Sequence, residues 1–287
     1  MAGDDRAETG RTILITGATS GIGLEAARML ARQGALVAVG ARDAAGGQLV
    51  VDEIIRSGGR AELFLADVSR LESLREAAAR FAAAHPRLDV LVNNAGIASR
   101  ERRVTDEGHV ITWATNVLAP FVLTRLLSGR LRAAPRPRVV NVGSAAHRSG
   151  RMSWDDLELS SGYGVWRAYS QSKLALLLLT REMARREPGL AVNVVHPGGI
   201  ATRIWRDLPW IARVLIDRLL PGPEKGAGPL VRLAGDPALD GVTGRYFDRY
   251  RETEPSASGR DDAAAVRLWE ILERAVARTP QGAPATA

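Results

Sequence analysis

Short apolar runs alternate with longer segments whose apolar residues recur at helical spacing along most of the chain. The runs show no polar alternation, which is typical of strands buried on both faces of a sheet. Because a helical segment separates most successive strands, the strands can run parallel, with right-handed crossovers that place helices on both faces. The pattern predicts an α/β protein with one doubly wound parallel sheet. The expected strands are Thr12–Thr16, Leu36–Gly40, Ala61–Leu65, Val90–Asn93, Val139–Val142 and Ala191–Val195, and the expected helices are Gly23–Arg32, Ala44–Ser57, Leu71–His85, Val110–Leu127 and Trp166–Arg185.

The 287 residues suit a single large domain with a short tail at each end. We expect residues 1–10 to be a flexible N-terminal tail, residues 11–278 to form the domain, and residues 279–287 to be a flexible C-terminal tail. Residues 202–223 are the expected substrate lid, because their apolar positions fit a short amphipathic helix. Such a helix can close over a hydrophobic ligand or simply pack on the domain. Its apolar residues are Trp205, Leu208, Trp210, Ile211, Val214, Leu215 and Ile216.

The composition excludes several classes of function. The chain has no cysteine, which excludes disulfides and thiol chemistry, and its four scattered histidines predict no metal site. The net charge of +7 comes almost entirely from arginines spread along the chain, which indicates a GC-rich bacterial genome and not nucleic-acid binding. No run approaches the ~18 apolar residues of a membrane-spanning helix, and the polar N-terminus is unlike a signal peptide. We therefore expect a cytoplasmic protein without a membrane anchor.

A glycine-rich loop lies between the first expected strand and the first expected helix. A helix N-terminus offers free N–H groups and a partial positive charge, so such a loop is typical of a phosphate cradle. Gly17 would allow the tight turn, Gly21 the approach of a pyrophosphate, and Gly23 close packing of the helix on the strand. The loop, placed between a strand and a helix, predicts a Rossmann-like dinucleotide site. Its expected binding residues are Gly17, Thr19, Ser20, Gly21, Ile22 and Gly23.

The end of the second expected strand bears on the choice of dinucleotide. An acidic residue there would accept hydrogen bonds from the adenosine ribose of NAD. Ala41 stands at that position and Arg42 follows, and a guanidinium can hold a 2′-phosphate through paired hydrogen bonds. The sequence therefore predicts that NADP(H) is preferred over NAD(H). Asp43 keeps NAD(H) open, because a shift of one residue would bring its carboxylate to the ribose.

Tyr169 and Lys173 are four residues apart in an expected helix. Residues at this spacing lie on one face, one turn apart, so the ammonium would lie near the phenol. A positive neighbour favours the phenolate and is expected to lower the pKa of Tyr169. A tyrosine with a lowered pKa can exchange a proton at neutral pH. A surface pair on an ordinary amphipathic helix is the alternative for the two residues taken alone.

Together these motifs give the chain a resemblance to the short-chain dehydrogenase/reductase family, from Arg11 to about Arg278. Within the family the chain is most similar to the retinol-dehydrogenase-like branch, which has a similarly long separation between Ser144 and Tyr169. Many members of that branch are anchored in a membrane, and we expect no such anchor here. The motifs, in the family's order, are Thr16-Gly17-x-x-x-Gly21-Ile22-Gly23, Asn93-Asn94-Ala95-Gly96, Asn116, Ser144, Tyr169-x-x-x-Lys173 and Pro197-Gly198, and the branch likeness lies in Val140–His147, Ala168–Ala175, Gly244–Phe247 and Leu268–Glu270.

The resemblance implies four catalytic residues. Tyr169 would be the general acid in reduction, and Ser144 would hydrogen-bond the same substrate oxygen. Lys173 would hold the nicotinamide ribose and lower the pKa of Tyr169. Asn116 would hold a water that links Lys173 to solvent, although an asparagine taken alone more often bonds the local backbone.

The resemblance also implies further cofactor contacts at the ends of later strands. Asp67 and Val68 would contact the adenine, although Asp67 with Ser69 could instead cap the helix that begins near Leu71. The remaining residues would surround the ribose, the nicotinamide and the phosphates. They are Asn94, Ala95, Gly96, Tyr169, Lys173, Pro197, Gly198 and Thr202.

These residues predict an NADP(H)-dependent oxidoreductase that interconverts a carbonyl and an alcohol on a hydrophobic small molecule, of a polycyclic or natural-product kind. The apolar pocket would be completed by the insert before Tyr169, through Met152, Trp154, Leu157, Tyr163 and Trp166. A non-redox tailoring enzyme (a cyclase, dehydratase or epimerase) and a catalytically silent NADP-sensing protein are the alternatives. The family also implies a homodimer or homotetramer.

Overall fold

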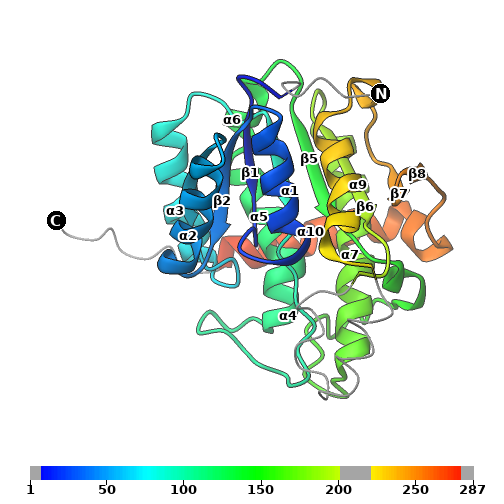
Figure 1. Ribbon diagram of the computed structural model, residues 1–287. Helices are drawn as coiled ribbons and strands as arrows, with labels where there is room; N and C mark the ends of the chain where they lie inside the picture. The colour runs from blue at the N-terminus through cyan, green and yellow to red at the C-terminus, as the bar shows by residue number, and fades with distance from the viewer. Residues whose placement is uncertain (1–7, 201–220, 279–287) are drawn as a thin grey trace.

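A single eight-stranded sheet forms the centre of the protein (Figure 1), for which a computed structural model describes residues 8–200 and 221–278. The strand order is β3-β2-β1-β4-β5-β6-β7-β8, and every neighbouring pair is parallel except β7 and β8. This confirms the expected doubly wound parallel sheet. The strands are β1 (Thr12–Ile15), β2 (Leu36–Ala41), β3 (Arg60–Leu65), β4 (Val90–Asn93), β5 (Arg138–Val142), β6 (Ala191–His196), β7 (Tyr246–Asp248) and β8 (Arg251–Glu252).

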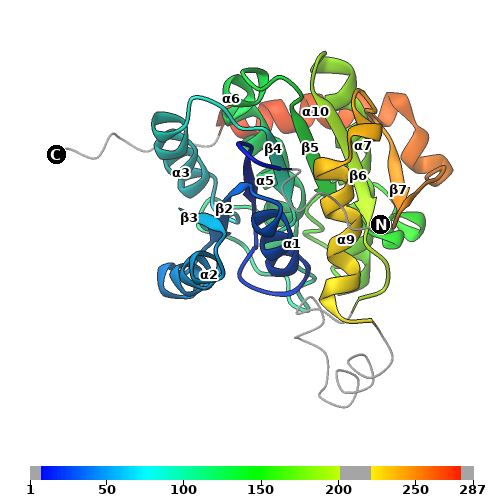
Figure 2. The same cartoon turned by 45° about the horizontal axis from the view of Figure 1, so that its top comes forward.

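Helices cover both faces of the sheet, as the alternation predicts (Figures 1 and 2). Successive side chains of a strand point to opposite faces. Thus Ile13 and Ile15 of β1 join one apolar cluster, with α1 (Gly21–Arg32), α2 (Ala44–Arg56) and α9 (Pro223–Gly235), whereas Leu14 joins the other. The second cluster contains residues of α3 (Leu71–Ala84), α5 (Ala119–Leu126), α7 (Val165–Arg186) and α10 (Asp262–Arg278). The shorter segments are α4 (Ile111–Trp113), a π-helical turn η1 (Ala114–Leu118), α6 (Ser128–Arg132) and the 3₁₀ turns η2 (Ala145–Ser149), η4 (Pro237–Leu239) and η5 (Ala257–Arg260).

The two strands at the end of the sheet were not expected from the sequence. β7 pairs with β6 through three residues and carries only two buried side chains, Tyr246 and Phe247. β8 has two exposed residues and pairs antiparallel with β7. Segments this short have no periodicity from which a strand could be recognised.

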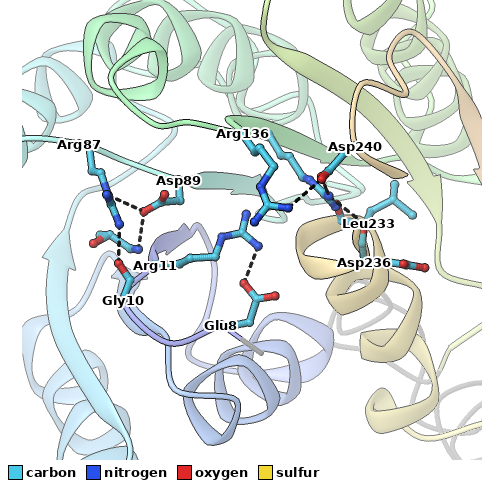
Figure 3. A network of polar contacts seen from close by, with 11 residues as sticks. Glu8, Gly10, Arg11, Arg87, Asp89, Arg136, Leu233, Asp236 and Asp240 are labelled. Atoms are coloured by element: carbon cyan, nitrogen blue, oxygen red, sulfur yellow. Dashed lines mark hydrogen bonds and ion pairs between the residues drawn. The ribbon is translucent and has the colours of Figure 1, made fainter. Parts of the chain in front are cut away.

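The start of the described chain belongs to the folded domain. Glu8 is 1% exposed, its N–H donates to the carbonyl of Gln33, and its carboxylate accepts a hydrogen bond from Arg11 at 2.6 Å (Figure 3). The prediction that residues 1–10 form a tail is therefore wrong for residues 8–10. Residues 1–7, residues 279–287 and positions 202–220 of the expected lid, with Thr202, lie outside the described residues. The last lid position, Pro223, is the first residue of α9.

A buried arginine, Arg138, joins the start of β5 to α9 through hydrogen bonds. Arg138 is 4% exposed, donates to the carbonyls of Leu233 and Asp236 at 2.9 and 2.8 Å, and pairs with the carboxylate of Asp240. A buried guanidinium is stable only when such partners satisfy it. This network lies at the amino ends of the strands, whereas the glycine-rich loop lies at their carboxyl ends. It therefore stabilises the fold and is not part of the loop's surroundings. Among the described helices, none is long and apolar enough to span a membrane.

Candidate active site

A cavity of about 400 Å³ lies at the carboxyl ends of the parallel strands, where ligands bind in doubly wound sheets. A second hollow shares residues 196–200 with it and lies away from Tyr169 and Ser144. Nearly all the predicted site residues that the structure describes line the first cavity; Gly23 and Asn116 do not. Those in its wall are Gly17, Thr19, Ser20, Gly21, Ile22, Arg42, Asp67, Val68, Asn94, Ala95, Gly96, Ser144, Tyr169, Lys173, Pro197 and Gly198.

The glycine-rich loop forms one end of this cavity with an open helix terminus. Gly17 has a φ of +65°, and a Cβ there would lie 3.0 Å from the Cα of Ala95. Any side chain at this position would therefore strain the turn and collide with the adjoining strand end. Helix α1 begins at Gly21, and the side chain of its N-cap residue, Ser20, makes no capping hydrogen bond. Among the described residues no side chain caps the first N–H groups of α1, which suits them to bind the pyrophosphate of a dinucleotide.

The side chain of Asn94 fixes the glycine-rich loop through hydrogen bonds to its backbone. Its Nδ2 donates to the carbonyls of Thr16 and Gly17 at 2.9 and 3.1 Å, while the Thr16 hydroxyl accepts from the N–H groups of Asn94 and Ala95. Gly23 packs against this contact, because a Cβ there would lie 2.3 Å from Asn94 Nδ2 and 2.5 Å from the Gly17 carbonyl oxygen. Gly23 therefore supports the loop by close packing instead of lining the cavity.

The end of β2 presents a cation to the cavity and no carboxylate. Ala41 and Arg42 are in the wall. The Asp43 side chain accepts a hydrogen bond from the Gly46 N–H at 2.7 Å as the N-cap of α2, and Asp43 is not in the wall. Among the described residues no carboxylate pairs with Arg42. Asp43 therefore serves as a helix cap outside the cavity wall, and its contact with a ribose stays an open alternative.

Asp67 lies in the cavity wall after β3 but does not cap α3. Its Oδ1 accepts hydrogen bonds from the N–H and the hydroxyl of Ser69 at 2.9 and 2.7 Å. The first N–H groups of α3, those of Leu71 and Glu72, donate instead to the carboxylate of Glu107 at 2.7 and 3.0 Å. The capping alternative is therefore wrong, because a residue from a distant loop supplies the cap.

The cavity wall brings together three of the predicted catalytic residues, Tyr169, Ser144 and Lys173. Ser144 ends the connection from β5 and is the N-cap of η2, where its hydroxyl oxygen accepts from the Ala146 N–H at 3.2 Å. The Ser144 hydroxyl also makes a hydrogen bond with the phenol of Tyr169, on α7. Lys173, one turn further along α7, donates from Nζ to the Val142 carbonyl at 2.8 Å and lies 5.7 Å from the centre of the Tyr169 ring.

The pKa of Tyr169 is shifted opposite to the direction expected from the sequence. Burial raises the pKa of the phenol, and the hydrogen bond with Ser144 opposes this shift. Burial also lowers the pKa of the Lys173 ammonium to about 8. The spacing of Tyr169 and Lys173 correctly predicted their proximity, but it contained no information on how strongly the fold desolvates both groups.

Asn116 lies in the π-helical turn η1 and is not part of the cavity wall. Such turns are frequent at functional sites. Its Nδ2 donates to the Ile97 carbonyl and the Ser172 hydroxyl at 2.9 Å each, and its Oδ1 accepts from the Ile97 N–H at 2.9 Å. Ser172 in turn donates to the Tyr169 carbonyl. Asn116 thus joins the loop after β4 to the helix that carries Tyr169. The water implied by the resemblance stays a prediction, and the two amide hydrogens are already donated to protein groups.

The insert before Tyr169 contributes less to the cavity than expected. Four of its five apolar residues, Met152, Trp154, Leu157 and Tyr163, pack against the main core instead of lining the cavity. Trp166 does not line the cavity either: it is 52% exposed, and the centre of its ring lies 6.3 Å from that of the Tyr169 ring.

Sequence reasoning missed part of the wall. The missed residues that directly follow expected strands, such as Ala66 and His196, could have been found from their position at a strand end. Arg103, Ile111 and Thr115 come from a loop and a helix start that carry no signal. The missed residues are Gly40, Ala41, Phe64, Ala66, Ser69, Ile97, Ala98, Ser99, Arg103, Ile111, Thr115, Val142, Gly143, His196, Gly199 and Ile200.

The family model for short chain dehydrogenases matches residues 11–209, and the chain belongs to the short-chain dehydrogenase/reductase family. Its relatives place it in the retinol-dehydrogenase-like branch, as the motifs predict. It is 36% identical to "Retinol dehydrogenase 14" of Homo sapiens over 94% of this chain and 88% of that protein. It is 39% identical to "Putative daunorubicin C-13 ketoreductase DnrU" of Streptomyces sp. (strain C5), over 94% of both chains.

A solved structure with the same fold carries a bound nucleotide. It is described as a "putative NAD(P) dependent gluconate 5-dehydrogenase" from Beutenbergia cavernae with bound NADP at low occupancy. The likeness has a TM-score of 0.70 and 33% sequence identity, and it covers 85% of this chain and 96% of that one. The family and these relatives establish the chain as a member of an oxidoreductase family that uses nicotinamide cofactors.

Proposed function

We propose that the protein is an NADP(H)-dependent oxidoreductase that interconverts a carbonyl and an alcohol on a hydrophobic small molecule, with Tyr169 as the general acid and base. The observation that carries the proposal is a shared cavity. A buried tyrosine, hydrogen-bonded to Ser144 and flanked by Lys173, faces the same cavity as the open N-terminus of α1.

The residues present fit a dinucleotide. The Gly17 turn and the N–H groups at the start of α1 suit the pyrophosphate, and we assign to Asp67, in the cavity wall, the role of acceptor for the adenine amine. Beside Gly96, where a Cβ would lie 3.5 Å from both Lys173 Nζ and Asn116 Oδ1, the backbone leaves room for a ribose. The preference for NADP(H) is supported by Arg42 in the cavity wall and by the use of Asp43 as a helix cap.

In reduction, Tyr169 donates its phenolic proton to the substrate oxygen. The Ser144 hydroxyl, which is hydrogen-bonded to the Tyr169 phenol in the structure, would turn its hydrogen to the same substrate oxygen and stabilise the developing alkoxide, while its own oxygen accepts from Ala146. Lys173, held by the Val142 carbonyl, supplies a positive charge near the phenolate that is left. A bound nicotinamide cofactor supplies the hydride in reduction and accepts it in oxidation.

The wall beyond Tyr169 supports a hydrophobic substrate. Ile97, Ala98 and Ile111 line this part, and the exposed Trp166 lies beside Tyr169. The names of two relatives point to the same class, since retinol is a lipophilic alcohol and daunorubicin a polycyclic ketone. A cytoplasmic location and a homodimeric or homotetrameric state stay predictions.

The direct test measures cofactor oxidation with a panel of lipophilic aldehydes, ketones and polycyclic quinones. The proposal expects turnover of at least one carbonyl compound with NADPH and weaker turnover with NADH. Failure of the whole panel with both cofactors contradicts it.

Arg42→Ala tests the cofactor preference separately. Losing a charge-assisted hydrogen bond costs about 1.5–3 kcal/mol, so the Kd for NADPH should rise about 10- to 100-fold while that for NADH changes little. Arg56→Ala, at the far end of α2, is the control and should change neither Kd. An equal loss for both cofactors in Arg42→Ala would show that Arg42 does not read the 2′-phosphate.

A further inference from the structure

We infer that His147 is a positioning residue that fixes the main chain of Ser144, and through it the orientation of the Ser144 hydroxyl. The inference rests on the proposed function, because it assigns a role through the serine that the proposed reaction uses. His147 belongs to the Val140–His147 segment, and its side chain does not line the cavity.

The imidazole of His147 joins two distant parts of the chain. It is 1% exposed, its Nδ1 lies 2.7 Å from the Ser144 carbonyl oxygen, and its Nε2 accepts a hydrogen bond from the Ser256 N–H at 3.3 Å. Because Nε2 is the acceptor for a backbone N–H, the ring hydrogen is on Nδ1 and is donated to Ser144. Burial lowers the pKa of His147, which favours this neutral form.

The contact restrains Ser144, whose hydroxyl must point at the substrate oxygen in the proposed reaction. The Ser144 carbonyl accepts from both the N–H and the Nδ1–H of His147, and the Ser144 hydroxyl oxygen accepts from Ala146. Ser144 therefore has both its carbonyl and its hydroxyl oxygen bonded within the same turn. Ser256, in the segment after β8, in turn fixes the ring plane. A catalytic donor displaced by about 1 Å loses on the order of 100-fold in rate.

The test uses three substitutions that separate the two hydrogen bonds. Asparagine can place an amide N–H near the position of Nδ1, glutamine can place an amide oxygen near the position of Nε2, and phenylalanine keeps the ring but neither bond. Each variant is made in the natural chain and in Ser144→Ala. The kcat and KM are measured with NADPH and 9,10-phenanthrenequinone as the carbonyl probe, and the fraction folded is measured by thermal unfolding.

We expect His147→Phe and His147→Gln to lower kcat by about 10- to 100-fold with little change in the KM for NADPH. His147→Asn should keep most of the kcat of the natural chain, because it retains the N–H that bonds Ser144. In the Ser144→Ala chain none of the three should lower kcat further, because the residue they position has been removed. Full activity of folded His147→Phe, recovery by glutamine and not asparagine, or additive losses with Ser144→Ala would overturn the inference. Wild-type activity of Ser144→Ala alone would instead overturn the proposed role of Ser144.

A second readout does not need turnover. Nitrogen-15 NMR of the histidine-labelled protein should show His147 as the neutral Nδ1–H tautomer near neutral pH. The Nε2–H tautomer or an imidazolium would contradict the inference even if the probe is not a substrate.

Discussion

Gly23→Ala tests how packing beneath the glycine-rich loop sustains the cofactor site. Gly23 is buried in α1, where alanine would ordinarily stabilise a helix by about 1 kcal/mol. Here the new Cβ would lie 2.3 Å from Asn94 Nδ2 and 2.5 Å from the Gly17 carbonyl oxygen. Asn94 can rotate away, but it would then lose its hydrogen bonds to Thr16 and Gly17, each worth about 1 kcal/mol.

The Gly17 carbonyl belongs to the backbone and cannot move without shifting the turn, and overpacking of this kind costs about 1–3 kcal/mol. With the gain in helix propensity included, we expect Gly23→Ala to lower the free energy of unfolding by about 2–4 kcal/mol. The Kd for NADPH should rise by roughly tenfold or more, because the cradle loses its shape.

Gly129→Ala is the matched control for this prediction. Gly129 also lies in a helix, α6, and a Cβ there would meet no atom within 4 Å. Denaturant unfolding and NADPH titration of both variants are the assay. We expect Gly129→Ala to be neutral or slightly stabilising. If the two variants behave alike, the packing argument is wrong.

The other predictions concern the fold. Hydrogen bonding to Glu158 raises the pKa of His109, so the stability from this pair is complete below about pH 6.5 and is lost as the pH rises through the higher folded-state pKa. Glu158→Gln should therefore reduce the fall in unfolding free energy between about pH 6 and about pH 9, and an unchanged pH dependence contradicts it. Arg138→Met leaves the carbonyls of Leu233 and Asp236 without their Arg138 donor and Asp240 with Arg136 alone, and it should cost about 3–5 kcal/mol without changing the Kd for NADPH. The exposed Arg136→Met should cost less than about 1 kcal/mol. Equal losses of unfolding free energy in the two arginine variants would show that burial of the Arg138 network does not determine its contribution to stability.

The sheet was predictable because the first six strands in the chain are mostly apolar runs and its first helices have a clear period. The site was predictable where one short motif brings its residues together, as in the glycine-rich loop and in the Tyr169–Lys173 pair. Both depend on local spacing, which a sequence contains directly.

What could not be predicted depends on contacts between residues far apart in sequence, or on burial. Glu107 caps α3 from 36 positions away, and the N–H that fixes His147 comes from Ser256. The raised pKa of Tyr169 reflects desolvation by the whole fold and not the neighbour at the fourth position. Asp43 shows the opposite case, since its hydrogen bond to the Gly46 N–H is a local helix cap between residues three positions apart.

The central claim is that Tyr169 transfers the proton, and one measurement tests it most directly. The kcat of Tyr169→Phe is measured at saturating NADPH with a carbonyl compound that the natural chain reduces, with the Kd for NADPH measured in parallel. Tyr246→Phe is the control, because the Tyr246 hydroxyl is buried without a hydrogen-bond partner among the described residues. We expect Tyr169→Phe to lose about 100-fold or more in kcat with an unchanged Kd, and Tyr246→Phe to keep its activity. A Tyr169→Phe variant that keeps most of its kcat would contradict the account.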